Sequence, residues 1–287
     1  MRKASGIVLV VLWFFASGLS HAEDVWLLST GQGAAQRLAD RVRAALPAGW
    51  TMTELRLGER PLEHCPGTRL ILAEGEESAR AALQGCPSAR VWAFALPALS
   101  LSGLQREAPG RVSGIGADVP FAHQAEVLAR LRPRPESVAV PFSPEAAGLA
   151  REAERALHAA GFRVILLSSE PLNQPLRPLR EVLGEVHAVL ALPDSTLYHE
   201  GLLKHWLLMT AREGVPMIGG LGRRSVQRGM VAAAVQQDEA VATLTLRLLP
   251  QLLGSGPMPA PQRVEASMVV ENAFMLDRLG LRLAEGQ

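Results

Sequence analysis

The sequence is short of aromatic residues, of cysteine and of long apolar segments. Phe, Trp and Tyr together make up 5% of the 287 residues, and Tyr198 is the only tyrosine. After the N-terminal region, no apolar run reaches the roughly 20 residues that a membrane-spanning helix needs. The formal net charge is +1 and no basic cluster stands out, so nothing in the charge favours a nucleic-acid partner. We therefore expect a soluble mature chain that binds no nucleic acid.

Residues 1–22 are typical of a cleavable secretory signal. A positively charged start is followed by an apolar run over residues 7–15, which is too short to span a bilayer as a stable helix. Ser20 and Ala22 place small residues at positions −3 and −1 of a cleavage site. We expect cleavage before Glu23, and because that residue is not Cys we expect no lipoprotein anchor. The pattern predicts a periplasmic protein, and an uncleaved anchor is the alternative.

The chain has two cysteines, Cys65 and Cys86, which is too few for a clustered metal site. In an exported chain such a pair favours a disulfide. Cys65 precedes an expected strand at residues 68–73, and Cys86 follows an expected helix at residues 77–83. In a strand–turn–helix unit these two ends return to the same edge of the sheet, away from the edge where a ligand binds. We predict a Cys65–Cys86 disulfide, with two free thiols as the alternative.

Short apolar runs alternate with longer amphipathic stretches, a pattern typical of parallel sheets with crossover helices. Two consecutive sets of such units, with a helix and a strand left over, predict an α/β protein of two lobes. Each lobe is then a parallel sheet flanked by helices, with a hinge between the lobes. The first lobe is expected to comprise residues 23–118 and about 232–260, and the second 119–231 and about 261–287. One continuous doubly wound domain is the alternative.

The apolar runs predict strands, and the amphipathic stretches predict helices. The expected strands are residues 25–29, 68–73, 90–95, 112–117, 137–141, 163–167, 188–192, 215–218, 230–235 and 263–270. The expected helices are residues 34–45, 77–83, 122–131, 145–160, 176–183, 198–213, 239–253 and 271–279. A loop rich in Leu, Ser and Pro is expected after residue 95.

Several segments carry motifs in the order that a known family has them. They are an apolar strand ending in Pro-Asp, a Val-Pro-Met-Ile-Gly strand, a Ser-Val-x-x-Gly segment and a closing Gly/Pro connection with Val-Val-Glu-Asn, at residues 186–196, 211–219, 225–232 and 254–281. Residues 111–115 and, more weakly, 73–79 add to them. With these motifs the chain resembles the ABC transporter substrate-binding protein family related to tryptophan- and tyrosine-binding lipoproteins. The resemblance implies a type I periplasmic-binding-protein fold, whose lobes close by a hinge motion over a small ligand.

Ligands of parallel sheets bind outside the carboxyl ends of the strands, where turns and helix N-termini offer unpaired donors. The strand-to-helix turns therefore supply the candidate ligand-binding residues. They are Ser29, Thr30, Gln32, Glu76, Ser78, Phe142, Asp194, Ser195, Thr196, Tyr198 and Ser225.

Asp194 could hold an amine or hydroxyl of the ligand, because Ser195 and Thr196 can cap the following helix and leave its carboxylate free. Helix capping is the alternative role of Asp194 and of the residues on the first turn. For Glu76 the alternative is to stabilise the helix dipole. For Tyr198 it is packing against a neighbouring helix.

Motifs for catalysis are missing. The sequence has no G-x-S-x-G elbow and no P-loop, and residues 31–33 lack the third glycine of a dinucleotide fingerprint. The histidines have no metal-ligand spacing. We therefore expect no enzyme activity, no cofactor and no metal.

The leading hypothesis is a periplasmic protein that captures a small polar or zwitterionic solute for an inner-membrane ABC permease. One alternative is a ligand sensor or accessory subunit for a membrane receptor or uptake system. A less favoured alternative is an enzyme, such as a hydrolase or isomerase, on the same fold.

Overall fold

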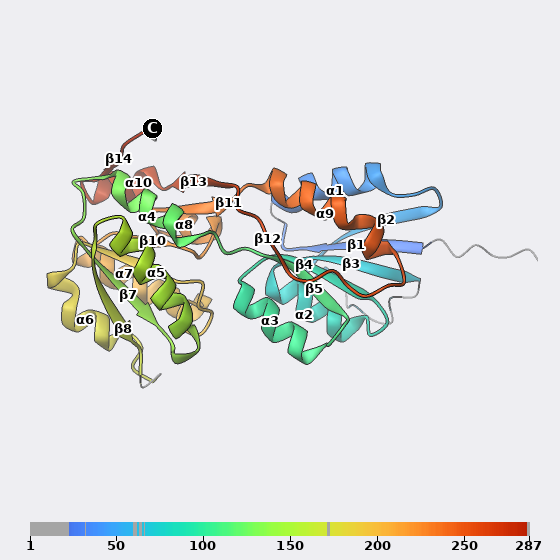
Figure 1. The fold of residues 1–287 in the computed structure, drawn as a ribbon, viewed down its shortest axis with the longest axis horizontal. Coiled ribbons are helices and arrows are strands. Elements are labelled where there is room, and N and C mark those ends of the chain that lie inside the picture. Colours follow the sequence, from blue (N-terminus) through green and yellow to red (C-terminus); the bar gives the residue numbers. More distant parts are fainter. Residues whose placement is uncertain are drawn as a thin grey trace, which may run out of the picture.

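The computed structural model describes residues 23–31, 33–59, 62, 65, 67–170 and 173–285, which form two α/β lobes joined by extended segments (Figure 1). The expected signal sequence and Gln32 lie outside the described residues. None of the helices in the described part of the chain is both long enough and apolar enough to cross a membrane.

The first lobe is built on a six-stranded parallel sheet with the strand order β12-β5-β4-β3-β1-β2. Helix α9 comes from the C-terminal part of the chain and packs beside α1 (Figure 1). The elements of this lobe are β1 Glu23–Ser29, α1 Gly33–Ala45, β2 Trp50–Arg56, β3 Thr68–Glu74, α2 Gly75–Gly85, β4 Arg90–Leu96, α3 Ala98–Glu107, β5 Val112–Gly116, α9 Asp238–Leu253 and β12 Gln262–Arg263.

The second lobe has a sheet with the order β13-β11-β10-β9-β7-β8, in which β13 is antiparallel to β11 and the other pairs are parallel. A small ladder of β14 and β6 lies beside it. The elements are α4 Phe121–Arg130, β6 Leu131–Arg132, β7 Ser137–Phe142, the 3-10 turn η1 Pro144–Ala146, α5 Ala147–Ala159, β8 Arg163–Ser168, α6 Arg177–Val182, η2 Leu183–Glu185, β9 Ala188–Ala191, α7 Glu200–Arg212, β10 Met217–Gly219, α8 Arg223–Gln227, β11 Ala232–Gln236, β13 Ser267–Glu271, α10 Ala273–Arg278 and β14 Arg282–Leu283.

Both faces of each sheet are buried, which explains why the central strands are continuous apolar runs. In β3, Leu70 and Leu72 belong to one apolar cluster of the first lobe, while Ile71 and Ala73 belong to the cluster on the opposite face. Alternate residues of a strand point to opposite faces, so a strand covered on both sides needs apolar side chains throughout. The expected α/β architecture of two sheets flanked by helices is confirmed.

The chain crosses between the lobes after β5, after β11 and after β12. Strand β11 pairs with β10 in the second sheet, and β12 pairs with β5 in the first. The second crossing therefore follows Gln236, and the third follows Arg263. The boundaries expected near residues 232 and 261 thus lie a few residues too early. The first was placed before β11, which still belongs to the second lobe, and the other before β12, which still belongs to the first lobe.

Hydrogen bonds connect the crossing segments to one another. The Gln236 side-chain amide donates to the carbonyl oxygen of Gly116 at 2.7 Å. The backbone amide of Gln237 donates to the Ala266 carbonyl at 3.1 Å, and its side chain donates to Ser267 at 3.0 Å. The segments that connect the lobes are therefore hydrogen-bonded to one another, close to the ends of β5 and β11.

Strand β2 and helix α3 are among the elements absent from the sequence prediction. Strand β2 lies at the edge of its sheet and is only partly buried, so it lacks the long apolar run of its neighbours. Helix α3 occupies the expected Leu/Ser/Pro-rich loop, where Leu101 and Leu104 share the buried face one turn apart. Pro97 immediately precedes this helix, a position where proline does not break it. The expected strand at residues 263–270 is divided into β12 and β13.

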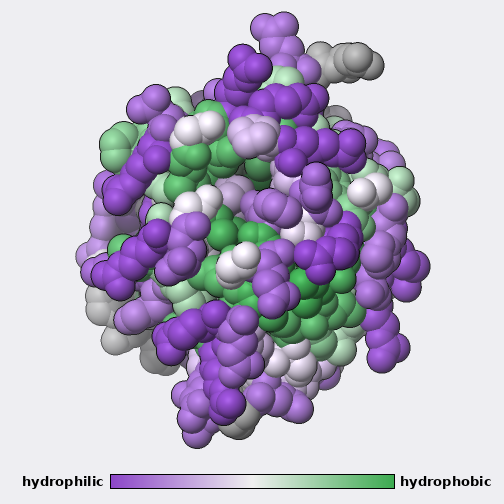
Figure 2. Space-filling view, turned by 90° about the vertical axis from the view of Figure 1, so that its left-hand side faces the viewer, coloured by the Kyte–Doolittle hydropathy of each residue, from purple (hydrophilic) through white to green (hydrophobic). Residues whose placement is uncertain are grey.

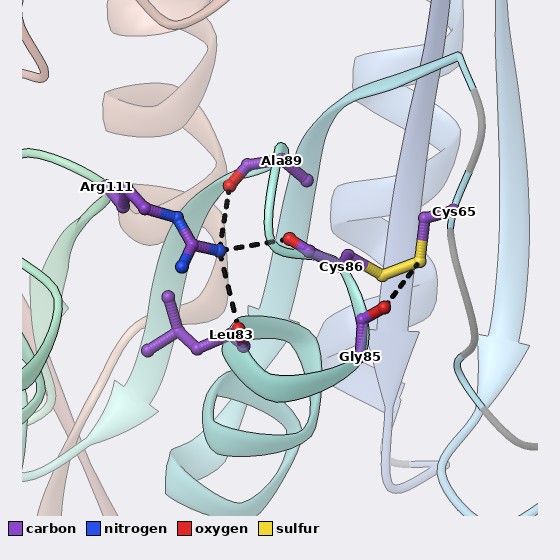
Figure 3. Close-up of a disulfide and its surroundings, with 6 residues drawn as sticks. All are labelled: Cys65, Leu83, Gly85, Cys86, Ala89 and Arg111. Atoms are coloured by element: carbon purple, nitrogen blue, oxygen red, sulfur yellow. Dashed lines mark hydrogen bonds between the residues drawn. A yellow bond between two sulfur atoms is a disulfide. The ribbon is translucent and has the colours of Figure 1, made fainter.

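The predicted disulfide between Cys65 and Cys86 is present, with the two Cα atoms 5.2 Å apart (Figure 3). Cys86 follows the C-terminus of α2, whose N-terminus is at the opposite edge of the sheet. Beside the bridge, the Arg111 guanidinium donates to the carbonyl oxygens of Cys86 at 3.0 Å and Leu83 at 3.4 Å. The disulfide thus ties the segment before β3 to the C-terminal end of α2. This end lies away from the N-terminus of α2, which is at the edge of the sheet that faces the other lobe.

Candidate functional site

A cavity of about 560 Å³ lies between the lobes, at the carboxyl ends of the strands of both sheets. The first lobe contributes the turns after β1, β3, β4 and β5, and the second lobe contributes the turns after β9, β10 and β11. Its lining includes Thr30, Glu74, Glu76, Glu77, Phe94, Ala95, Asp118, Asp194, Ser195, Tyr198, Gly220, Arg223, Ser225 and Gln236. This is the edge where parallel sheets bind ligands, because turn backbones and helix N-termini converge there.

Charged residues of both signs line the cavity, with Arg37 on the first wall and the buried Asp194 on the second, but their balance differs between the walls. Carboxylates come mainly from the first lobe, which supplies Glu74, Glu76, Glu77, Asp118 and Asp238. The turn after β10 in the second lobe supplies arginines, Arg223 and Arg224. An elongated ligand with a positive and a negative end would therefore meet complementary charge on both sides.

Asp194 lines the cavity, but its carboxylate accepts hydrogen bonds from backbone amides of its own lobe. The side chain is 2% exposed, and one oxygen accepts a hydrogen bond from the Ser143 amide at 2.8 Å. The other oxygen accepts from the amides of Thr196 at 3.0 Å and Leu197 at 3.4 Å. The premise that Ser195 and Thr196 would leave this carboxylate free is therefore wrong. Asp194 organises the turn itself.

The Tyr198 side chain also packs and hydrogen-bonds inside the second lobe. Its hydroxyl donates to the Pro141 carbonyl at 3.3 Å, and its ring centroid lies 5.4 Å from that of Trp206. Burial raises the pKa of Tyr198 well above its ordinary value, and the negative charge of Asp194 adds to the effect. Tyr198 therefore stays a neutral hydroxyl in the cavity wall, packed against helix α7 as the alternative interpretation proposed.

Glu74 and Thr30 connect neighbouring strand ends on the first wall. The Glu74 carboxylate, at the end of β3, accepts hydrogen bonds from the Thr30 amide at 3.0 Å and the Thr30 hydroxyl at 3.2 Å. Glu74 is only 2% exposed. This buried side chain thus holds the turn after β1 in place at the edge of the cavity.

Asp118 lies where the chain leaves the first lobe after β5. Its carboxylate accepts a hydrogen bond of 2.7 Å from the amide of Ala98, the first residue of α3. Burial raises the pKa of Asp118 above its ordinary value and outweighs the opposing effect of this hydrogen bond. Asp118 is thus a buried carboxyl group of the cavity wall with a raised pKa.

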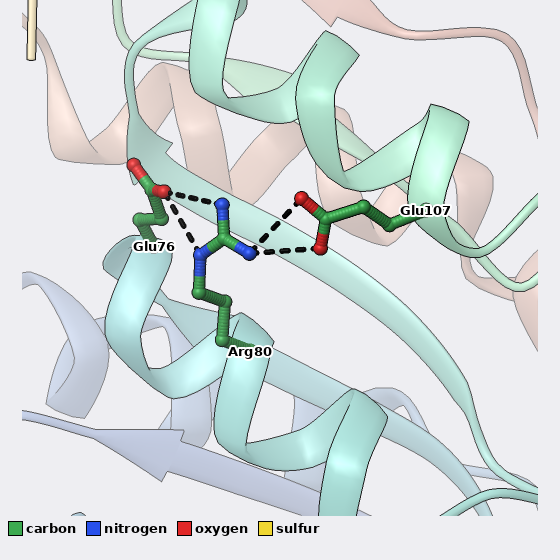
Figure 4. A network of polar contacts seen from close by, with 3 residues as sticks. All are labelled: Glu76, Arg80 and Glu107. Carbon is green, nitrogen blue, oxygen red and sulfur yellow. Dashed lines mark hydrogen bonds and ion pairs between the residues drawn. The ribbon is translucent and has the colours of Figure 1, made fainter.

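Glu76 belongs to an ion-pair network on the surface (Figure 4). The Arg80 guanidinium donates to Glu76 at 2.9 Å, one turn away on α2, and to Glu107 of α3 at 2.8 Å. These two carboxylates raise the pKa of Arg80. The network joins α2 to α3 and orients Glu76, whose carboxylate is partly exposed at the rim of the cavity.

A second ion-pair network spans the two lobes. Asp238, at the start of α9, pairs with Arg37 of α1, and its carboxylate lies 3.9 Å from the guanidinium of Arg223 in the second lobe. All three residues line the cavity. The spacing of Arg223 from Asp238 is that of a loose ion pair, which a change in the angle between the lobes can make or break.

The backbone at the end of β4 departs from regular strand geometry beside the cavity. Ala95 has φ +58°, in the left-handed region that favours glycine. The register between β4 and β5 shifts between Ala93 and Leu96, which marks a bulge. The bulge turns Ala95 outward, where it is exposed and lines the cavity.

Six of the predicted ligand residues line the cavity, namely Thr30, Glu76, Asp194, Ser195, Tyr198 and Ser225. The others in the described part of the chain do not. Ser29 accepts a hydrogen bond from the Gly31 amide, Ser78 is fully buried in α2, Phe142 packs against the core of the second lobe, and Thr196 points to solvent. Gln32 lies outside the described residues.

Sequence reasoning missed Glu74, Asp118, Arg223 and the pair Arg37–Asp238. Glu74 and Asp118 have the same signal that singled out Asp194, since each is an acidic residue at the end of an apolar strand. Among the described residues, no three His, Cys, Asp or Glu side chains come together as a metal site would need.

No family model matches the chain, and no curated protein matches it significantly in sequence. Its fold is similar to solved structures that it covers over 92% of its own length and 96% of theirs, each with a TM-score of 0.61. One is an ABC domain from Streptococcus pneumonia in complex with L-Trp, at 14% identity. Another, also at 14%, is the ligand-free, open form of a substrate-binding protein with adhesive properties from Clostridium difficile. A third is a conserved domain protein from Vibrio cholerae, at 13%. The likeness confirms a two-lobed fold like that of periplasmic binding proteins.

Proposed function

We propose that this protein is a periplasmic solute-binding protein that holds a small polar or zwitterionic ligand between its lobes for an inner-membrane ABC importer. The observation that carries the proposal is the cavity between the lobes. Its volume, about 560 Å³, is within the range of about 300–1,000 Å³ that is typical of small-molecule sites. Both of its walls are made of strand-to-helix turns, so closure of the lobes would surround a ligand with backbone donors.

The charges of the cavity support a zwitterionic ligand. An ammonium group would find the carboxylates of Glu76 and Glu77 on the first lobe, and a carboxylate group would find Arg223 on the second. Charge-assisted hydrogen bonds of this kind are stronger than neutral ones. Ser195 and Ser225 add hydroxyl groups to the second wall.

Export is supported by two independent features. The N-terminal 22 residues have the charge, apolar core and small residues of a cleavable signal. The Cys65–Cys86 disulfide is the kind of bond that persists in an oxidising compartment such as the periplasm.

A binding role is also supported by the solved structures with the same fold, two of which are named for ligand or substrate binding. The polar side chains of the cavity are engaged in holding turns, as Asp194 and Glu74 are, and this favours recognition over catalysis.

A thermal-shift screen of amino acids, small carboxylates and purines tests the proposal. A ligand at 100 times its dissociation constant stabilises the folded state by about 2.7 kcal/mol, which moves the melting temperature by several degrees. The blocking variant is Ser195→Trp, because Ser195 is exposed and lines the cavity. Thr196→Trp is the matched control. Thr196 is the next residue along the chain, and its side chain is exposed but does not line the cavity.

The proposal expects at least one compound to stabilise the wild type and Thr196→Trp but not Ser195→Trp. If no compound stabilises the wild type, or if both variants respond equally, the cavity is not the ligand site. Chemical conversion of the stabilising compound by the protein would contradict the binding role and favour an enzyme.

A further inference from the structure

A second hollow, an apolar groove of about 750 Å³, lies on the outer surface of the second lobe. It runs between α7, the C-terminal end of α8 and α10. Its apolar floor consists of Leu203, Leu207, Leu208, Ala211 and Met275. Leu208 is 46% exposed and is one of the few large apolar residues that the described part of the chain leaves at the surface.

The rim of the groove is cationic. Lys204, Arg212, Arg228 and Arg278 line it and are all exposed, and no Asp or Glu occurs among the described residues of the lining. The chain as a whole has 29 basic and 28 acidic residues. The groove therefore carries a local excess of positive charge, although the chain as a whole is nearly neutral.

Figure 2, which faces the end of the molecule formed by the second lobe, shows apolar residues gathered near the centre of this face and bordered by hydrophilic side chains. Phe274 of α10 is 69% exposed, and it lies one helical turn from Arg278 on the same side of the helix. An exposed aromatic residue beside a groove residue extends the apolar surface outward.

The groove is separate from the cavity between the lobes, since the two share no lining residue. Helix α7 connects them. His199, directly before α7, lines the cavity, whereas Arg212 at the end of α7 lines the groove. A partner in the groove would thus leave the cavity open for ligand.

We propose that this groove binds an acidic amphipathic helix of a partner protein. A helix lays its apolar face into a groove of this kind, and its flanking carboxylates would meet the cationic rim on both sides. A second copy of the chain fits poorly, because a two-fold interface would place the same four cations against each other. A bilayer is flat, whereas this surface is hollow.

The first experiment measures binding of a synthetic probe to the full mature protein by fluorescence anisotropy. The probe is a labelled helical peptide with Leu at positions i, i+3, i+4 and i+7 and Glu at the flanking positions, and a matched peptide has Lys in place of Glu. The proposal expects saturable binding of the Glu peptide alone, weakened by salt. Leu208→Asp and Arg278→Glu should each weaken it by about tenfold or more, which is about 1.4 kcal/mol.

Leu99→Asp is the control variant, because Leu99 is a large apolar residue that is 38% exposed on α3 of the first lobe, far from the groove in sequence and fold. It should bind the Glu peptide as the wild type does. Circular dichroism of all three variants should show unchanged folding, since each replaced side chain is exposed.

A second experiment uses the chain's lysine content. Lys204 is the only lysine after Lys3, so in the mature protein a carbodiimide can join peptide carboxylates only to Lys204 or to the N-terminal amine. The proposal expects a cross-link from the Glu peptide to Lys204, identified by mass spectrometry. Lys204→Arg should abolish the cross-link while keeping the charge and the anisotropy signal.

Several results would overturn the proposal. One is equal binding of the Glu and Lys peptides, or binding that Leu208→Asp leaves unchanged. Another is attachment of the cross-link to the N-terminus alone. Association with phosphatidylglycerol vesicles that depends on Leu208, without peptide binding, would assign the groove to a membrane surface. A dimer in sedimentation that Leu208→Asp dissociates would assign it to a second copy.

Discussion

The carboxylate of Asp194 accepts a 2.8 Å hydrogen bond from the backbone amide of Ser143. Asp194 follows β9 and Ser143 follows β7, and these two strands are neighbours in the second sheet. One buried side chain therefore fixes two adjacent strand ends at the edge of the cavity. A similar arrangement occurs in the first lobe, where Glu74, the last residue of β3, accepts a hydrogen bond from the backbone amide of Thr30 after β1.

Asp194→Ala should destabilise the protein. The amides of Ser143 and Leu197, both fully buried, would lose their acceptor. Each unsatisfied buried donor costs about 1–3 kcal/mol, so the two amides predict a loss of about 2–6 kcal/mol in the free energy of unfolding. Urea denaturation measures it, and Ser195→Ala at the exposed neighbour is the control. A wild-type free energy of unfolding in Asp194→Ala would contradict the structural role.

Ala95→Gly should stabilise the protein or leave its stability unchanged. The left-handed conformation at φ +58° costs a residue with a Cβ about 1–2 kcal/mol, and glycine avoids this cost. The greater freedom of glycine in the unfolded chain offsets about 0.5–1 kcal/mol of the gain. Ala93→Gly in the same strand is the control and should destabilise, since Ala93 is fully buried in the regular part of β4. A lower melting temperature for Ala95→Gly would contradict the argument.

Reduction of the Cys65–Cys86 disulfide should lower the free energy of unfolding by about 3 kcal/mol, the value of the chain-entropy model for a loop of this size. The cysteines are 21 positions apart, and both are buried. The double variant Cys65→Ser with Cys86→Ser should show the same loss in urea without reductant. Thiol titration of the unfolded, unreduced wild type should find no free thiol, and two titratable thiols would refute the bond in solution.

The contribution of Asp118 to stability should depend on pH. Burial raises the pKa of Asp118, so the folded protein binds this proton more tightly than the unfolded chain does. By linkage, its contribution is largest at low pH and falls as pH rises from about 4, the ordinary carboxyl value, through the raised value. Asp118→Asn keeps an acceptor for the Ala98 amide and removes the titration. The wild type should therefore lose stability relative to Asp118→Asn between acidic and neutral pH, and a constant difference in urea experiments would contradict the assignment.

The chain should be exported and cleaved before Glu23. N-terminal sequencing of protein purified from the periplasm of its native host should read Glu-Asp-Val-Trp. The physical reason is the apolar run over residues 7–15, long enough for a signal and too short for an anchor. A membrane-bound product, or one that begins at Met1, would show that the signal is not processed.

The sequence by itself determined the α/β architecture, the disulfide and the edge of the sheet where the cavity lies. These properties follow from local patterns. A strand buried on both faces must be apolar throughout, as β9 is, and a parallel sheet brings the ends of its strands to one edge. The partly exposed edge strand β2 has no such pattern, and for that reason it was missed.

Only the tertiary structure decided which turn residues face the cavity and what their side chains contact. Thr30 lines the cavity while Ser29 does not, although the two are adjacent, because Ser29 is the last residue of β1 and Thr30 begins the turn. The Asp194 carboxylate was expected to be free, and its partner Ser143 lies 51 positions away. Arg37 and Asp238 meet across 201 positions. Partners so distant in sequence are set by how helices and strands pack, and no local spacing in the chain encodes that packing.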